Sequence, residues 1–146
     1  MGTEPPRDDA SKVCPEAVEV LTARFDGEIG NIADARLAAG LFLDTLQPHD
    51  PPMSPASRGN ILLVVTELAA NAIQYAPGPF SVRMHRTFED VQVTVRDKNP
   101  IEPTPRPCDL VRGVGGRGWP LIHALSRQVS VLHDPGGKNI HALMSW

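Results

Sequence analysis

Cysteine is scarce in this sequence: among its 146 residues there are two, Cys14 and Cys108. Their spacing is not that of a cysteine metal site, and two thiols are too few for a disulfide scaffold. The five histidines include no pair at metal-ligand spacing either. Because serine-hydrolase and cysteine-protease signatures are also missing, we expect neither metal-only nor acyl-transfer chemistry.

Long apolar runs are absent as well. No run approaches the roughly 20 residues that are needed to span a bilayer. The first residues, MGTEPPRDDA, lack the basic and then apolar order of a signal peptide. We therefore expect a cytoplasmic protein that makes no membrane contact.

Positive charge is not in excess. The formal net charge is −3, whereas nucleic-acid binders usually have a strongly basic surface, so we expect no direct nucleic-acid binding. Residues 1–80 contain five Lys and Arg against eleven Asp and Glu, while residues 81–146 contain nine against six. The locally positive C-terminal part suits a small anionic ligand better than a polynucleotide.

The length and composition that are present indicate one globular domain. An apolar share of 41% and a charged share of 21% are ordinary, and 146 residues can bury one sizeable core. Residues 1–17 are polar, contain proline and show no periodicity, which predicts a mobile tail. The domain is expected at residues 18–146.

Hydrophobic periodicity predicts three helices and five strands. Asn31 and Ser54 are the predicted N-caps of the first two helices, with Pro55 in the first turn of the second. In chain order the predicted elements are a strand at 18–25, helices at 32–46 and 55–76, a hairpin of strands at 80–88 and 91–97, a helix at 119–126, and strands at 128–133 and 140–146.

One predicted helix, 61-ILLVVTELAANAIQYA-76, is apolar on almost every side but contains Glu67 and Asn71. Residues four apart lie one above the other on a helix, so these two side chains share a stripe that Gln74 extends. A buried unpaired carboxylate is costly, so Glu67 must reach solvent, a partner or a ligand cavity. Taken alone, the segment slightly favours a solvent-facing stripe.

Two further stretches are candidates for ligand contact. Asp97 ends a predicted strand and can present its oxygens into a cleft, although a turn carboxylate is the commoner role. The glycines of 113-GVGGRG-118 precede a predicted helix, an arrangement that can bind phosphate, and Arg117 can add a charged contact. A flexible linker is the alternative for this segment.

The same glycines also match G-x-G-x-x-G, the fingerprint of dinucleotide-binding folds. That fingerprint requires a strand immediately before it, and the preceding residues are PTPRPCDLVR. We interpret the match as accidental. The phosphate loop G-x-x-x-x-G-K-[ST] also fails, because Gly118 is followed by Trp119.

Taken together and in this order, the Glu67-x-x-x-Asn71 pair, Asp97 and the Gly116-Arg117-Gly118 turn resemble the ATP-binding domain of the gyrase and histidine-kinase ATPase superfamily. Within it, the chain resembles the small bacterial anti-sigma factor serine kinases. The resemblance covers roughly residues 18–146. It implies an α/β two-layer sandwich, with one mostly antiparallel mixed sheet of about five strands and three helices on one face.

The resemblance also implies a ligand, Mg-ATP, and roles for individual residues. Glu67 would be the catalytic base, Asn71 the magnesium ligand and Asp97 the residue that accepts a hydrogen bond from the adenine amino group. The residues that the resemblance places at the nucleotide are Asn71, Asp97, Asn99, Gly113, Gly115, Gly116, Arg117, Gly118, Trp119 and Asn139.

Three of these positions depart from the family pattern. Asn99 stands where a glycine often follows the aspartate by two residues, and Trp119 stands where a leucine usually follows the lid glycine. Asn139 follows the Gly136-Gly137-Lys138 turn, where threonine is common. The left-handed backbone that such a glycine often adopts is better tolerated by asparagine than by most residues.

The resemblance implies a regulatory function. The chain would hold a sigma factor and phosphorylate a serine of a STAS-type anti-sigma factor antagonist, and the family suggests a homodimer. Because a phosphorylatable helical hairpin and a transducer domain are both missing, a free-standing regulator is expected. A binding module that uses ATP without phosphoryl transfer is the alternative, and a nicotinamide-dependent enzyme ranks far below both.

Overall fold

The structure is a computed structural model that describes residues 20–99 and 118–146. The predicted tail at 1–17 lies outside these residues. The element types and their order agree with the sequence prediction, and the ends differ by a few residues. The elements are β1 (Val20–Phe25), α2 (Asn31–Leu46), α3 (Ala56–Tyr75), β2 (Phe80–Arg86), β3 (Asp90–Asp97), α4 (Gly118–Leu125), β4 (Gln128–Asp134) and β5 (Gly137–Ser145).

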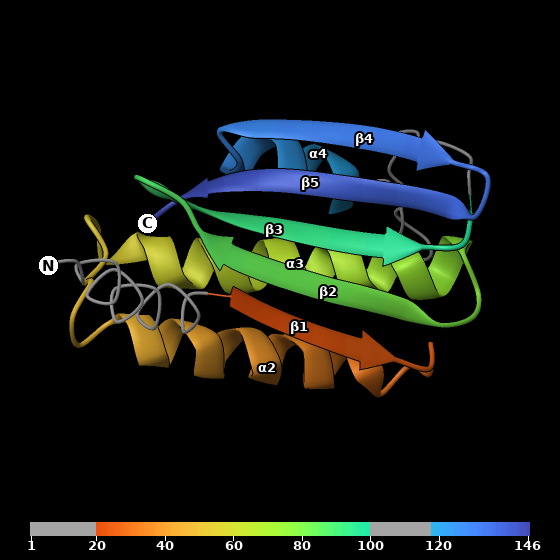
Figure 1. Ribbon diagram of the computed structural model, residues 1–146, viewed down its shortest axis with the longest axis horizontal. Helices are drawn as coiled ribbons and strands as arrows, with labels where there is room; N and C mark the ends of the chain where they lie inside the picture. The colour runs from red at the N-terminus through yellow and green to blue at the C-terminus, as the bar shows by residue number, and fades with distance from the viewer. Residues whose placement is uncertain (1–19, 100–117) are drawn as a thin grey trace, which may run out of the picture.

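The five strands form one open sheet in the order β1-β2-β3-β5-β4 (Figure 1). Each neighbouring pair of these described strands is antiparallel, so the sheet is wholly antiparallel where a mostly antiparallel mixed sheet was predicted. The chain passes from β3 through α4 to the edge strand β4. It then returns as β5, which pairs with β3 and β4 and so occupies the place between them.

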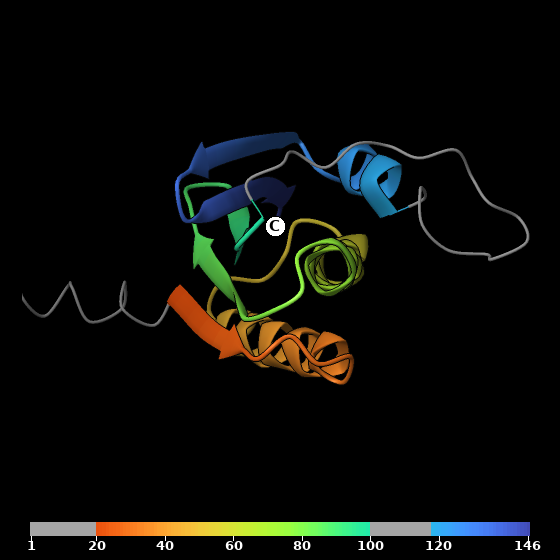
Figure 2. The same cartoon turned by 90° about the vertical axis from the view of Figure 1, so that its right-hand side faces the viewer.

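The three helices cover one face of the sheet, which gives two layers (Figures 1 and 2). Alternate residues of β3, including Val91, Val93 and Val95, are fully buried against the helices, as the two-residue period of a strand requires. The long α3 contributes Ile61, Val65 and other buried apolar residues to the same core. The predicted α/β sandwich is therefore confirmed. No helix in the described part of the chain is long and apolar enough to cross a bilayer.

The helix starts differ in detail from the predicted caps. Gly30 occupies the cap position of α2, and Asn31 Oδ1 instead accepts hydrogen bonds from the backbone N–H groups of Gly27 and Glu28. Asn31 thus stabilises the turn that precedes the helix. At α3 the cap position is Pro55, and Ser54 Oγ accepts a hydrogen bond from the backbone N–H of the next residue but one.

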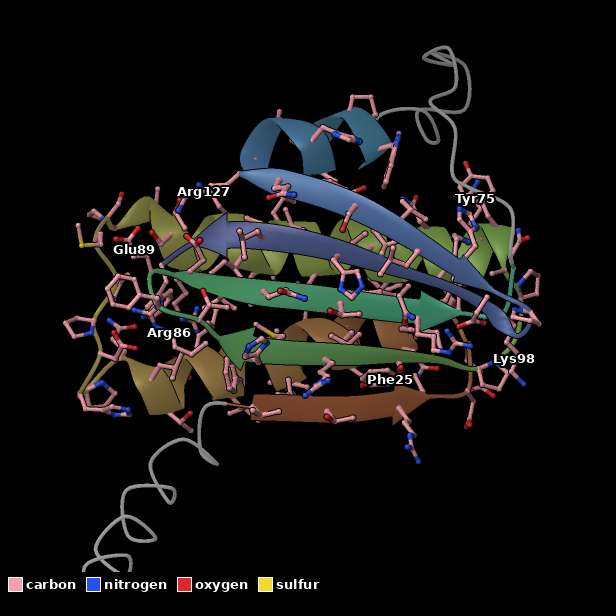
Figure 3. The ribbon with its side chains drawn as sticks, turned by 45° about the horizontal axis from the view of Figure 1, so that its top comes forward. Phe25, Tyr75, Arg86, Glu89, Lys98 and Arg127 are labelled. Carbon is pink, nitrogen blue, oxygen red and sulfur yellow. The ribbon has the colours of Figure 1, made fainter. Side chains whose placement is uncertain are left out.

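The end of the sheet that bears Arg86, Glu89 and Arg127 is fastened to the loop after α2 (Figure 3). The Arg86 guanidinium donates to both carboxylate oxygens of Asp50 and to the backbone oxygens of Thr87 and Asp90. The Trp146 indole N–H donates to the Asp50 backbone oxygen at 2.6 Å. The hydrogen bond from Arg86 lowers the pKa of Asp50 below its ordinary value, against the opposing effect of burial.

This network generates a stability prediction. Asp50→Asn removes the charge from a bidentate, largely buried pair and should cost about 1–3 kcal/mol of unfolding free energy at neutral pH. The matched control is Asp44→Asn, because Asp44 pairs with Arg58 through side chains that are 58% and 37% exposed. Exposed pairs contribute about 0–1 kcal/mol, so the control should change little. Urea unfolding followed by circular dichroism measures both.

The same pair predicts a pH dependence. A carboxylate whose pKa is lower in the folded state stabilises the fold above its unfolded-state pKa and loses this contribution as the pH falls through its folded-state pKa. The free energy of unfolding of the native protein should therefore exceed that of Asp50→Asn by a constant amount near neutral pH. This difference should shrink below about pH 4. A margin that stayed constant down to acid unfolding would contradict the proposed ion pair.

Candidate functional site

The predicted stripe on α3 faces another helix. Glu67 and Asn71 are half-buried, whereas Gln74 is exposed. A Cβ atom built on Gly118, the first residue of α4, would lie 2.5 Å from Glu67 Oε1 and 3.6 Å from Asn71 Oδ1. The carboxylate and the amide therefore meet the start of α4, and the interpretation of a purely solvent-facing stripe is wrong for these two residues.

The close approach at Gly118 has chemical consequences. Any other L-residue there would bring its Cβ atom within 2.5 Å of Glu67 Oε1, so the Glu67 side chain would have to shift to admit it. The first turn of a helix also presents unpaired N–H groups and a partial positive charge. Two protein oxygens beside that charge form a place where a bound anion and its cation can be held together.

The donor set beside Gly118 fits magnesium better than a transition metal. Mg²⁺ prefers oxygen ligands and is often held by one or two protein groups together with phosphate and water oxygens. The Asn71 amide oxygen supplies one such group. Across the described ranges there is no cluster of three or more His, Cys, Asp or Glu side chains that could hold a metal without a ligand.

A second polar group lies at the end of β3. Asp97 is only 3% exposed, and its Oδ1 accepts hydrogen bonds from the Asn99 backbone N–H and from Lys138 Nζ, both at 2.9 Å. The other carboxylate oxygen, Oδ2, accepts no hydrogen bond from any residue that the structure describes. A buried carboxylate oxygen without a donor is a candidate acceptor for a ligand.

Lys138 is the partner that the sequence reading missed. Its side chain is 3% exposed, and its ammonium group donates to Asp97 and, at 3.0 Å, to the Asn99 backbone oxygen. One signal could have revealed it, because Lys138 stands in phase with Ile140 and Ala142, which face the core. Asn139 is one residue out of phase and pairs with Arg96 in the sheet, so the structure does not bring it to Asp97.

The backbone around this ion pair is tightly fixed. Gly137 has a φ of +147°, and a Cβ atom there would overlap the backbone oxygen of Asp97. On the other side of the same turn, Arg96 donates to both oxygens of Asp134 at 2.8 and 3.0 Å. That hydrogen bond lowers the pKa of Asp134 and raises the pKa of Arg96.

Asn99 joins this group to α3. Its side-chain amide donates to the backbone oxygen of Tyr75, the last residue of α3, at 2.8 Å. Tyr75 and Lys98 accordingly lie at the same end of the molecule (Figure 3). The first polar group is thus carried by α3 at Glu67 and Asn71, and the second contacts the end of the same helix at Tyr75. Glu67 and Tyr75 are about 12 Å apart along the helix axis.

The remaining predicted residues divide into two sets. Trp119 is 9% exposed, packs in the hydrophobic core, and its ring meets His123 edge-on with ring centres 4.7 Å apart. It supports the start of α4 through packing. Gly113, Gly115, Gly116 and Arg117 lie outside the described residues.

Solved structures of similar fold include the crystal structure of the RsbU and RsbW domains of Rv1364c from Mycobacterium tuberculosis. It matches with a TM-score of 0.61 and 16% identity over 86% of this chain and 31% of that one. The histidine kinase domain of a blue-light activated histidine kinase from Erythrobacter litoralis EL346 matches at 20% identity over 76% of this chain and 60% of that one, with a TM-score of 0.43. This chain therefore spans less than two thirds of either protein.

A search of curated protein sequences finds no match. The model of the histidine kinase-like ATPase domain family, in contrast, matches residues 13–144, which is nearly the whole sequence. The open antiparallel sheet with three helices on one face is consistent with that fold. The chain belongs to the histidine kinase-like ATPase domain family.

Proposed function

We propose that this chain binds Mg-ATP between α3, the start of α4 and the end of β3, and transfers its γ-phosphoryl group to a serine of a regulatory partner. The observation that supports this most is the convergence of Glu67 and Asn71 on Gly118. It places a carboxylate, a magnesium-compatible amide oxygen and a helix N-terminus at one point. Family membership independently favours ATP as the ligand.

The adenine would lie at the other polar group. Asp97 Oδ2 is the free acceptor there, and an exocyclic amino group is a matching donor. A guanine would present a carbonyl oxygen to the carboxylate and be repelled. Along α3, the triphosphate would then extend from the end near Tyr75 towards Asn71 and Gly118.

At the phosphate end each residue has a distinct task. Asn71 Oδ1 would hold the magnesium ion, which neutralises charge on the phosphate oxygens when bound. Glu67 would accept the proton of the attacking serine hydroxyl while that oxygen bonds to the γ-phosphorus. The bond from the γ-phosphorus to the bridging oxygen breaks, and ADP leaves with that oxygen.

The proposed biological role is that of an anti-sigma factor that phosphorylates an antagonist protein. The RsbW domain in the structural neighbour and the family resemblance support this role. The alternative is a module that binds ATP and a partner without phosphoryl transfer. The two proposals share Asn71 and Asp97 and differ only in the need for Glu67 as a base.

The magnesium site predicts a selective defect. Asn71→Ala should leave ATP binding in EDTA unchanged and remove the gain in affinity that magnesium gives, because the amide oxygen is lost. Gln74→Ala, an exposed change on the same helix, should keep that gain. Calorimetric titrations of each protein with ATP, in Mg²⁺ and in EDTA, measure both quantities. A normal magnesium dependence in Asn71→Ala would exclude this residue as the ligand.

The role of Glu67 as general base predicts that its loss slows phosphoryl transfer without weakening ATP binding. Glu67→Gln retains size and hydrogen bonding but not basicity, so ATP should still bind while transfer slows by roughly 10²–10⁴-fold. Incubation of purified protein with γ-labelled ATP and candidate antagonists measures transfer to serine. Equal rates in the two proteins would remove Glu67 from the mechanism. Tight ATP binding without labelled serine on any antagonist would favour the passive module.

A further inference from the structure

The buried ion pair at the end of β3 has unused hydrogen-bonding capacity. A lysine ammonium group has three N–H donors, and two of those of Lys138 are directed to Asp97 Oδ1 and to the Asn99 backbone oxygen. Within residues 20–99 and 118–146 the third has no acceptor. Both side chains are 3% exposed, so bulk water does not readily satisfy it.

The free donor has a free acceptor as its neighbour. Asp97 Oδ1 receives both of the carboxylate's hydrogen bonds, which leaves Oδ2 without one. Lys138 Nζ and Asp97 Oδ1 are 2.9 Å apart, so the unused N–H and the unused oxygen belong to groups in direct contact. Buried polar groups are nearly always paired, and an adjacent unpaired donor and acceptor indicate a ligand with the opposite pattern.

The pair is also held in place before any ligand arrives. The close approach of Gly137 to the Asp97 backbone fixes β5 against β3, and the Asn99 side chain fixes the following turn to Tyr75. The Lys138 contact to the Asn99 backbone oxygen closes the loop of interactions. Preorganised groups of this kind give a binding site specificity, since a mismatched ligand cannot make them rearrange.

We propose that Lys138 is a second residue that recognises the base. Asp97 accepts a hydrogen bond from the amino group of the base, and Lys138 donates its remaining N–H to the ring nitrogen beside that amino group. The edge that fits is a ring nitrogen, a carbon and an amino group in sequence, as in N1, C6 and N6 of adenine. This inference rests on the proposed function, because it concerns the same nucleotide site.

The two residues together exclude guanine more strongly than Asp97 does alone. Guanine has an acceptor oxygen where adenine has its amino group, and an N–H donor where adenine has its ring nitrogen. In the adenine pose the oxygen would face the Asp97 carboxylate, and the N–H would face the Lys138 ammonium group. Both contacts would be repulsive, which is an effective way to achieve specificity.

The test compares ATP with 1-deaza-ATP, in which C–H replaces the ring nitrogen beside the amino group. The unaltered protein should bind 1-deaza-ATP about 10- to 100-fold more weakly, the usual effect of one lost hydrogen bond to a charged donor. 7-Deaza-ATP, altered in the other ring, should bind like ATP. Calorimetric titration or displacement of a fluorescent ATP analogue gives the affinities. Equal binding of ATP and 1-deaza-ATP by the unaltered protein would overturn the inference.

Variants then assign the effect to one side chain. Lys138→Met keeps roughly the length of the side chain but removes its charge, so this variant should bind ATP and 1-deaza-ATP equally. Lys138→Arg, which retains donors, should recover part of the preference. The control is Lys98→Met, because Lys98 is an exposed lysine beside Asp97 and should keep the full preference. Full preference in a folded Lys138→Met protein would overturn the inference.

The outcomes also separate this inference from the proposed function. If Lys138→Met does not fold, the affinities of the unaltered protein for ATP and 1-deaza-ATP still test the inference. If the unaltered protein binds ATP and Asp97→Asn weakens that binding, but 1-deaza-ATP binds as well as ATP, only the role of Lys138 is wrong. If the unaltered protein binds no ATP, both proposals fail.

Discussion

The packing of α3 is limited by two polar side chains on a helix that must otherwise be buried. Glu67 and Asn71 cannot face the sheet, because the residues there are apolar and would leave a carboxylate unpaired. They face α4, whose first residue, Gly118, leaves room for the Glu67 carboxylate in its present position. This contact and the core packing of Trp119 and Ile122 together place α4 beside α3.

Much of the fold could be predicted from the sequence, because alternation and helical periodicity are strong in β2, β3, α2 and α3. The strand order was not predictable in the same way, since it depends on long-range pairing of β5 with β3. Cap positions were also missed: Asn31 is a strong N-cap residue locally, yet its side chain is used by the preceding turn. Tertiary context decided both cases.

Part of the candidate site could likewise be predicted from the sequence, and part could not. The i to i+4 spacing of Glu67 and Asn71 was visible in the sequence, and so was the position of Asp97 at a strand end. The partner of Asp97 was not found, because a lysine after two glycines looks like an ordinary turn residue. Only the register of β3 with β5 places Lys138 opposite Asp97 and shows that Asn139 lies on the other face.

We propose that one nucleotide contacts both polar groups, Glu67 with Asn71 and Asp97 with Lys138. Manganese can replace magnesium, and its unpaired electrons broaden the NMR signals of nearby nuclei. In a titration with Mg-ATP, the amide signals of Asn71, Gly118, Asp97 and Lys138 should shift, and that of His141 on the helix-free face should shift least. When a small fraction of the magnesium is replaced by manganese, the broadening should be largest at Asn71 and Gly118 and smaller at Asp97 and Lys138. Broadening centred on other residues, or no change at 97 and 138, would contradict the account.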